Sequence, residues 1–371
     1  MNAFRTILLL SLFIASAQEQ WWSVRTSGMD TNLRGVSAAH TPDARGLSTP
    51  AVWVSGSNGV ILRSLDLGKT WKRLHVAGGD SLDFRGIVAF DANNAYVMSS
   101  GEGEKSRIYK TTDGGESWKL QYTDNRKEFF LDSIACLSEE ECFALGDPIN
   151  GKFLLLKTTD GEHWQALPND NMPAALPKEG AFAASNSCLA LSGDHIFFVT
   201  GGPAARVFHS TDAGRTWTAT ETPIAHGNGS SGIFSIARPD MEVASAMVVV
   251  GGDYQDPKRP LAIAATSLDQ GNNWKLSAGQ PSGFRSAVAS LDIFLFYTVG
   301  PNGEEMTEDQ GAHWKRIGSL NLNALAMLDD SHGWAVGPNG TIAVFVNHQQ
   351  YEIRNRPPQK GLTSPAIAVA E

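Results

Sequence analysis

One eight-residue motif recurs along the chain and limits its possible fold more than any other feature. The copy from Ser210 to Trp217 places Asp, Gly and Trp at its third, fifth and eighth positions. Its aspartates recur every 40 to 57 residues, at Asp66, Asp113, Asp160, Asp212, Asp269 and Asp309. A period of this size in a strand-rich sequence indicates a propeller or a solenoid with one supersecondary unit per repeat.

The residue types of the motif predict a turn between two strands. Asp accepts hydrogen bonds from the backbone N–H groups that follow it, and Gly gives the turn its backbone freedom. Trp begins the returning strand and buries its ring between units. The motif is identified as the Asp-box, or bacterial neuraminidase (BNR) repeat, which is a structural element in several families. It therefore indicates a fold and not a reaction.

Each repeat divides into four short strands, with the Asp-box between the third and the fourth. The innermost strands are predicted to begin at residues 33, 84, 131, 181, 233, 284 and 322. The seventh unit lacks a box and a fourth strand, and residues 20–25 resemble the strand that follows every box. We therefore predict an all-β, seven-bladed β-propeller over residues 18–348, closed by the N-terminal strand, with a tail over residues 349–371.

The first residues and the cysteines predict an exported protein. Met1–Ala17 combines Arg5, an apolar run and the small residues Ala15–Ala17, as a secretory signal peptide does. Cys136 and Cys142 flank a short turn, so we expect a disulfide between them in an oxidising compartment, whereas Cys188 reads as a buried thiol. The net charge of −9 argues against nucleic acid as the main partner.

Candidate binding residues come from comparing one position at the start of each innermost strand. Arginine occupies this position in three blades that ring closure makes close neighbours, and two further candidates come from turns on the same face. The predicted binding residues are Arg34, Arg85, Asp132, Arg285 and Asn323, with Arg206 and Asp253 from the turns; Phe182 and Phe234 occupy the same position in two other blades. Clustered guanidinium groups need carboxylates of the protein itself or an anion from outside, and the sequence leaves both open.

A catalytic site is the weaker interpretation of the same face. Glu179 and Asp253 are the candidate pair of carboxylates for glycoside hydrolysis, although sequence spacing cannot test their separation. The histidines show no metal-ligand spacing, and no nucleotide fingerprint is present, so neither a metal nor a cofactor is expected.

From Gln20 to Val346 the chain resembles the photosystem II stability/assembly factor family. The likeness rests on the Asp-boxes, on strand starts such as Leu33–Val36 and Phe84–Ile87, and on the closing stretch Gly333–Gly340. The resemblance implies a seven-bladed propeller without enzymatic activity that binds a newly made membrane-protein subunit. By position, Arg34, Arg85 and Arg285 correspond to the arginine patch implicated in that contact.

Two classes of function follow from the sequence. The first is an exported, non-enzymatic propeller that binds a protein or peptide partner, such as an envelope or membrane-protein subunit. The second is a secreted, sialidase-like glycoside hydrolase, or a binder of acidic glycans. Sialidases share the Asp-box, but they have six blades and a Phe/Tyr-Arg-Ile-Pro motif that is absent here. The first class is the prediction, and the second is the alternative.

Overall fold

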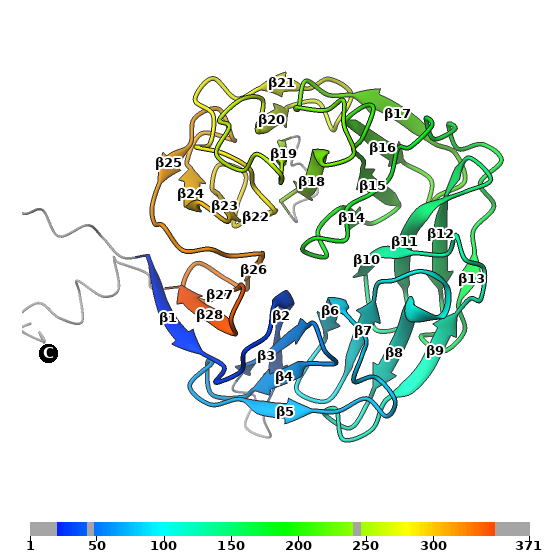
Figure 1. Ribbon diagram of the computed structural model, residues 1–371, viewed down its shortest axis with the longest axis vertical. Coiled ribbons are helices and arrows are strands. Elements are labelled where there is room, and N and C mark those ends of the chain that lie inside the picture. The colour runs from blue at the N-terminus through cyan, green and yellow to red at the C-terminus, as the bar shows by residue number, and fades with distance from the viewer. Residues whose placement is uncertain (1–20, 43–47, 240–245, 346–371) are drawn as a thin grey trace, which may run out of the picture.

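Seven four-stranded antiparallel sheets form a ring. The computed structural model describes residues 21–42, 48–239 and 246–345. Figure 1 shows the sheets arranged around a central axis, with β2, β6, β10, β14, β18, β22 and β26 innermost. The predicted all-β, seven-bladed propeller is confirmed. The predicted signal peptide Met1–Ala17 and the tail over residues 349–371 lie outside the described residues.

The blades are numbered along the chain. From the inner to the outer strand, blade 1 comprises β2 (Leu33–Pro42), β3 (Ser48–Gly56), β4 (Ile61–Ser64) and β5 (Lys72–Leu74), and blade 2 comprises β6 (Phe84–Ala89), β7 (Ala95–Ser99), β8 (Arg107–Thr111) and β9 (Lys119–Thr123). Blade 3 comprises β10 (Leu131–Cys136), β11 (Cys142–Ile149), β12 (Lys152–Thr158) and β13 (Gln165–Ala166). Blade 4 comprises β14 (Leu189–Ser192), β15 (His195–Val199), β16 (Arg206–Ser210) and β17 (Thr218–Glu221).

Blades 5 and 6 comprise β18 (Ser231–Ala237), β19 (Met247–Asp253), β20 (Ala264–Ser267) and β21 (Lys275–Leu276); and β22 (Ala287–Ser290), β23 (Phe296–Gly300), β24 (Gly303–Thr307) and β25 (Lys315–Arg316). Blade 7 comprises β26 (Ala324–Met327), β27 (Gly333–Val336), β28 (Thr341–Phe345) and β1 (Trp22–Thr26). A single 3₁₀ turn, η1 (Gly103–Lys105), connects β7 to β8. No helix in the described ranges is long and apolar enough to cross a membrane.

The N-terminal strand closes the ring, as the sequence predicts. β1 pairs with β28 from Trp22 opposite Phe345 to Thr26 opposite Thr341. Trp22 is 2% exposed, and its ring meets the Phe345 ring edge-on at 5.3 Å between centroids. First and last strands thus share one sheet, which joins the two ends of the propeller and removes an open strand edge.

The core lies between neighbouring sheets, where large side chains from two blades meet. Trp53 of blade 1 is fully buried, and its indole N–H donates to the Asp91 carbonyl beyond β6 at 3.0 Å. Phe153 of blade 3 packs against Phe198 of blade 4, with ring centroids 5.1 Å apart. The buried residues form separate clusters, such as the one that joins Phe153 of blade 3 to Phe198 of blade 4, so each blade buries its faces against its neighbours.

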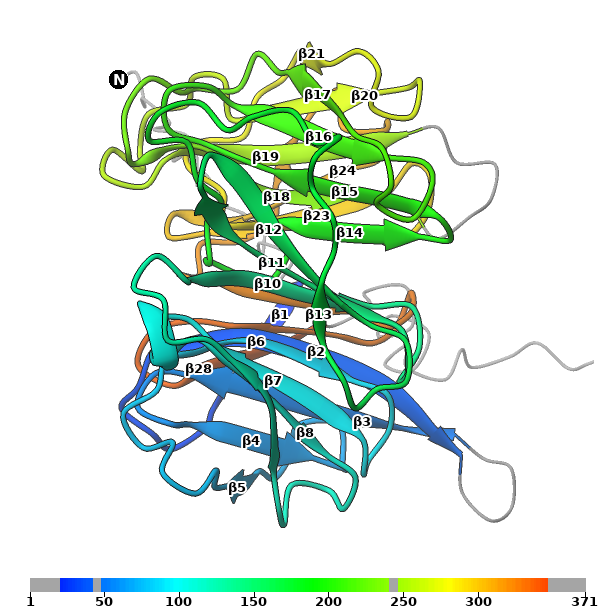
Figure 2. The ribbon, with the colours of Figure 1, turned by 90° about the vertical axis from the view of Figure 1, so that its right-hand side faces the viewer.

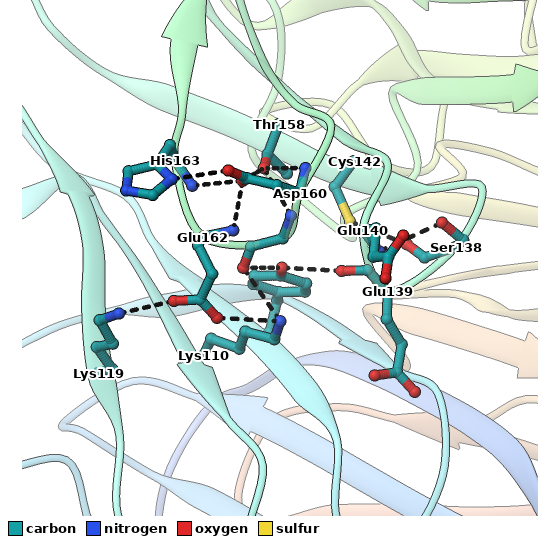
Figure 3. Close-up of polar contacts among 12 residues, drawn as sticks. Lys110, Lys119, Ser138, Glu139, Glu140, Cys142, Thr158, Asp160, Glu162 and His163 are labelled. Atoms are coloured by element: carbon teal, nitrogen blue, oxygen red, sulfur yellow. Dashed lines mark hydrogen bonds and ion pairs between the residues drawn. The ribbon is translucent and has the colours of Figure 1, made fainter.

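The Asp-boxes have the predicted turn chemistry. In blade 4, Thr216 donates its backbone N–H to Asp212 at 2.8 Å and its hydroxyl to the same carboxylate at 2.6 Å. The shorter box of blade 3 keeps this pattern: Figure 3 shows Asp160 accepting from the Glu162 and His163 backbone N–H groups, each at 2.8 Å. The Trp217 indole N–H donates to the Gly214 carbonyl at 3.0 Å, which fixes the ring at the blade interface.

Cys136 and Cys142 form a disulfide across the first hairpin of blade 3. They are directly paired residues of β10 and β11, with Cα atoms 4.0 Å apart. Cys188 is a buried free thiol whose pKa is raised by burial and by the nearby Asp132 carboxylate.

The sequence misplaces the start of blade 4. A strand was predicted over residues 181–185, whereas β14 begins at Leu189, and residues 181–187 instead turn toward the centre of the ring (Figure 1). We call residues 181–187 the plug, because they bond to four different blades. Its contacts are Ala183 O with Arg85 Nη1 at 3.0 Å, Asn186 Oδ1 with Ile134 N at 2.8 Å, Ser187 Oγ with Ser235 Oγ at 2.7 Å, and Ser185 Oγ with Ser286 O at 2.7 Å.

Side-on, the blades fan around the axis, and the long β2–β3 hairpin projects beyond its neighbours (Figure 2). The innermost strands all begin at one face of the ring, which we call the mouth face. The Asp-boxes lie at the opposite face, where the third strand of each blade ends.

Candidate functional site

The innermost strands of four blades contain a β-bulge in their first half. The pairing register skips one residue in each, at Arg34 in β2, Arg85 in β6, Asp132 in β10 and Phe234 in β18. A bulge leaves one residue out of the ladder and re-aims its side chain, and bulges are common beside functional sites. These are four of the positions that the sequence comparison singles out.

A pocket of about 380 Å³ opens at the mouth face of the ring. The plug contributes to it, and the remaining residues come from the starts of the innermost strands and from the turn after β19. It is lined by Arg34, Arg85, Phe182, Ala183, Ala184, Phe234, Tyr254, Phe284, Ser286 and Asn323. We call this cavity the mouth pocket.

One side of the mouth pocket carries two arginines that share a single carboxylate. Arg85 Nε donates to Asp83 at 2.7 Å, while Arg34 Nε lies 3.8 Å from the other oxygen of the same group. Arg34 Nε is buried and has no hydrogen-bond partner among the described residues. Burial and the charge on Arg85 lower the pKa of Arg34, while Asp83 raises it. Two guanidinium groups and one carboxylate leave this side with a net positive charge.

The other side of the mouth pocket is aromatic. The rings of Phe182 and Phe234 stack with centroids 3.8 Å apart and planes 7° apart. Phe284 and Tyr254 meet the Phe234 ring edge-on, at 4.7 and 6.1 Å. We call these four rings the aromatic wall. Tyr254 is 48% exposed and forms its outer end.

Asn323 lies in the pocket lining, but its amide nitrogen is already used. It donates to Asn32 Oδ1 and to the Leu33 carbonyl, both at 2.7 Å, and so connects blade 7 to blade 1. The Ser286 hydroxyl donates to the Asn323 carbonyl at 2.7 Å. Asn323 Nδ2 and Ser286 Oγ thus form hydrogen bonds between neighbouring blades.

Asp132 does not line the mouth pocket. It is 1% exposed, and neither carboxylate oxygen has a hydrogen-bond partner among the described residues. Burial and the neighbouring Asp147 raise its pKa well above the ordinary value, against the opposite effect of Arg85. Burial also raises the pKa of Asp147 to about 6, although the Ala181 backbone N–H donates to it at 3.2 Å. Asp147 therefore lies next to the plug, and Asp132 is its buried neighbour.

Arg285 is not at the mouth, in contrast to the sequence prediction. Its side chain is fully buried and pairs with Glu305 at 3.1 Å, and it donates to Ser282 Oγ at 3.0 Å. The reason is local: β22 begins only at Ala287 and has no bulge, so Arg285 precedes the strand and turns into the body of blade 6.

Arg206 and Glu179 form a buried ion pair with each other, so neither side chain is available to a ligand. Arg206 Nε donates to Glu179 at 2.8 Å, a second guanidinium nitrogen bonds to its other oxygen, and the Glu179 side chain is 0% exposed. Thr200 and the Leu176 backbone N–H fill the remaining acceptor positions, at 2.7 and 2.8 Å. A binding role for Arg206 and a catalytic role for Glu179, both predicted from the sequence, do not fit this closed ion pair.

Asp253, the other carboxylate of the predicted pair, organises its own turn. It accepts from the Gln255 backbone N–H at 2.9 Å and from Asn228 Nδ2 at 3.1 Å. Although burial raises its pKa, hydrogen bonds from Ser230, Asn228 and the backbone hold it below the ordinary value. The group is therefore an ionised acceptor at neutral pH.

Sequence reasoning missed the plug and the aromatic wall. In the sequence, Phe182 and Phe234 occupy the same position at the start of the innermost strand as Arg34 and Arg85 do in their blades. Two aromatic residues at equivalent positions are the signal that could have suggested the wall. The stacking of Phe182 depends on a loop that leaves the repeat pattern, so no periodic signal places it. Among the described residues, no group of three or more His, Cys, Asp or Glu could hold a metal ion.

Comparison with known proteins confirms the predicted likeness to the photosystem II assembly factor family. Residues 101–227 match the family model described as photosynthesis system II assembly factor YCF48. A solved structure described as "YCF48 bound to D1 peptide" aligns with a TM-score of 0.60 at 16% identity, over 88% of this chain and 97% of that one. YCF48 from Cyanidioschyzon merolae aligns with a TM-score of 0.61 at 14% identity, over 88% and 99%. Among curated proteins none matches significantly.

Proposed function

We propose that this chain, a propeller similar to YCF48, is an exported, non-enzymatic protein that binds a polypeptide partner through the mouth pocket. A carboxylate of the partner lies against Arg34 and Arg85. The observation that carries the proposal is the charge imbalance at these two side chains, which are 24% and 27% exposed and share the single carboxylate of Asp83. A bound carboxylate supplies the missing negative charge and accepts from the exposed part of each guanidinium group.

The structural neighbours support a polypeptide as the partner. One YCF48 structure holds a D1 peptide, so a propeller of this shape accommodates a peptide. In the present chain the partner is proposed to be an envelope protein or a membrane-protein subunit.

Export is the second part of the proposal. It rests on the signal-like sequence Met1–Ala17 and is supported by the Cys136–Cys142 disulfide, since such bonds persist mainly in oxidising compartments. Intact-mass measurement of the protein from the cell envelope tests it. We expect a chain that begins near Gln18, whereas a full-length chain in the cytoplasm contradicts the proposal.

The absence of catalysis is the third part. Its support is the closed Glu179–Arg206 ion pair, which leaves Glu179 without a position from which to protonate a leaving group. An acidic glycan, the alternative ligand, is kept as an outcome of the binding test.

A pull-down from envelope extract tests the binding role. Wild-type protein is compared with an Arg34→Gln/Arg85→Gln variant and with Arg73→Gln, which removes an exposed arginine of β5 on the outer rim. We expect a discrete polypeptide retained by the wild type and by Arg73→Gln, lost by the double variant, and released by salt. Equal retention by all three, or recovery of an acidic oligosaccharide in place of a polypeptide, contradicts the proposal.

A further inference from the structure

We infer that the mouth pocket recognises two neighbouring groups of one extended polypeptide segment: a carboxylate, held by Arg34 and Arg85, and a large apolar side chain next to it, held by the aromatic wall. The inference rests on the proposed function and specifies its ligand. No sequence with a carboxylate alone, or an apolar side chain alone, satisfies both sides of the pocket.

The aromatic wall is preformed. Phe182 packs where three glycines bring the chains of blades 3, 4 and 5 together, through bridges between Gly180 and Gly201 and between Gly201 and Gly232. A Cβ atom at Gly201 would lie 2.2 Å from Phe182 Cε2, so only glycine leaves room for the ring. Phe234 is 3% exposed and Phe284 6% exposed, which holds the far rings in place. A ligand therefore meets a fixed apolar surface and loses little affinity to ordering of the protein.

The two sides lie within one small cavity. A pocket of about 380 Å³ is near the lower limit for ligand sites, so it accepts only a short segment. The carboxylate and the apolar group must then come from adjacent parts of that segment. Since the whole chain carries a net charge of −9, the cationic side of this pocket contrasts with the rest of the protein and favours an anionic ligand there.

The chemistry of the wall favours an amino-acid side chain over a sugar. Phe182, Phe234 and Phe284 have no polar atoms, Tyr254 carries one hydroxyl at the outer end of the wall, and the nearby donors Asn323 Nδ2 and Ser286 Oγ already bond within the protein. A sugar would bring hydroxyl groups to this surface, and each would lose its hydrogen bonds to water. An aliphatic or aromatic side chain loses none and buries apolar surface against the rings.

A set of labelled peptides tests the inference by fluorescence anisotropy. Short glycine–serine peptides carry a carboxylate and a phenylalanine next to each other, the carboxylate alone, the phenylalanine alone, or neither. The carboxylate is supplied in one arm by a free C-terminus and in another by an internal glutamate in an amidated peptide, so that the two sources are distinguished. The proteins are the wild type, Tyr254→Ala, Arg34→Gln and Phe294→Ala, the last removing a 51% exposed ring outside the pocket.

We expect the peptide with both groups to bind the wild type at least about tenfold more tightly than either peptide with one group. Tyr254→Ala should weaken only the peptides that contain phenylalanine, and Arg34→Gln only those that contain a carboxylate, whereas Phe294→Ala should leave all affinities unchanged. Because Tyr254 is half exposed, its removal should leave folding intact, which circular dichroism checks.

The outcomes separate the inference from the proposed function. If carboxylate peptides bind through Arg34 regardless of the phenylalanine, the inference is overturned and the proposed function stands. If no peptide binds the wild type, or if binding ignores Arg34→Gln, both are overturned. Tighter binding of the peptide with both groups, lost selectively in Tyr254→Ala, supports both.

Discussion

Arg34 and Arg206 both lie on the mouth side of the ring, but their surroundings differ. Arg206 meets a dedicated carboxylate, Glu179, and is closed off from solvent, whereas Arg34 shares Asp83 with Arg85. Sequence position predicted similar roles for both arginines. Their difference arises from the partners that the connecting segments bring, and these segments carry no repeat pattern.

The first prediction concerns the buried ion pair. Glu179→Gln leaves the Arg206 charge buried without its counter-ion, so the free energy of unfolding should fall by about 3 kcal/mol. Urea unfolding measures the change. The matched control is Glu116→Gln, which removes a 63% exposed partner of Lys72 and should change stability by less than about 0.5 kcal/mol. Equal effects of the two substitutions would show that Glu179 is not a closed structural partner.

The second prediction concerns the acid beside the plug. The folded pKa of Asp147, about 6, lies above its ordinary value of 3.8, so folding favours the protonated form. Its stabilising contribution is full below about pH 4 and is lost as the pH rises through 6. Asp147→Asn resembles the protonated form, so its stability relative to wild type should increase from pH 4 to pH 7. A pH-independent difference between the two proteins contradicts this assignment.

At the scale of elements, the Asp-box turns follow from sequence and the plug does not. The boxes use local hydrogen bonds between residues at most four apart, so their residue types determine their geometry. The plug is held by bonds to four blades that are distant in sequence, as in the contact of Ser185 with Ser286. Short-range patterns do not contain such partners, so the start of β14 and the place of Phe182 could not be predicted from them.

The third prediction tests the box turn. Gly214 has φ 88°, and a Cβ atom there would lie 2.9 Å from Leu167 Cδ1. Gly214→Ala should therefore lower the free energy of unfolding by about 1–3 kcal/mol, through backbone strain and crowding. Gly229→Ala is the control, because a Cβ atom at Gly229 meets nothing within 4 Å. It should be neutral or slightly stabilising, and a comparable loss at both sites would refute the strain argument.

At the scale of the whole molecule, ring closure joins residues 22–26 to residues 341–345 in one sheet. The sequence predicted this closure. Six Asp-boxes are each followed by a fourth strand, the seventh repeat has no such strand, and the N-terminal segment resembles the strand that is missing. It predicted the neighbourhood of Arg34, Arg85 and Asn323 for the same reason. The prediction was wrong for Arg285. The order of the blades in the ring shows which blades are neighbours, but it does not determine where a side chain points when its residue precedes the strand.

The fourth prediction tests ring closure. Trp22→Ala removes a buried ring from the closing strand and should lower the free energy of unfolding by about 3–5 kcal/mol. Val24→Ala, on the same strand at a 45% exposed position, should have little effect. Thermal unfolding of both variants measures this. A small loss for Trp22→Ala would mean that the ring does not depend on β1.

The mouth pocket is proposed to bind a carboxylate-bearing polypeptide segment, and a crystal structure of the protein with the peptide that combines a carboxylate and a phenylalanine is the decisive test. We expect the carboxylate about 2.7–2.9 Å from guanidinium nitrogens of Arg34 and Arg85. We also expect the phenylalanine ring against Phe182 and Tyr254. A peptide bound elsewhere on the ring, with the mouth pocket empty, would show that the mouth pocket is not the binding site.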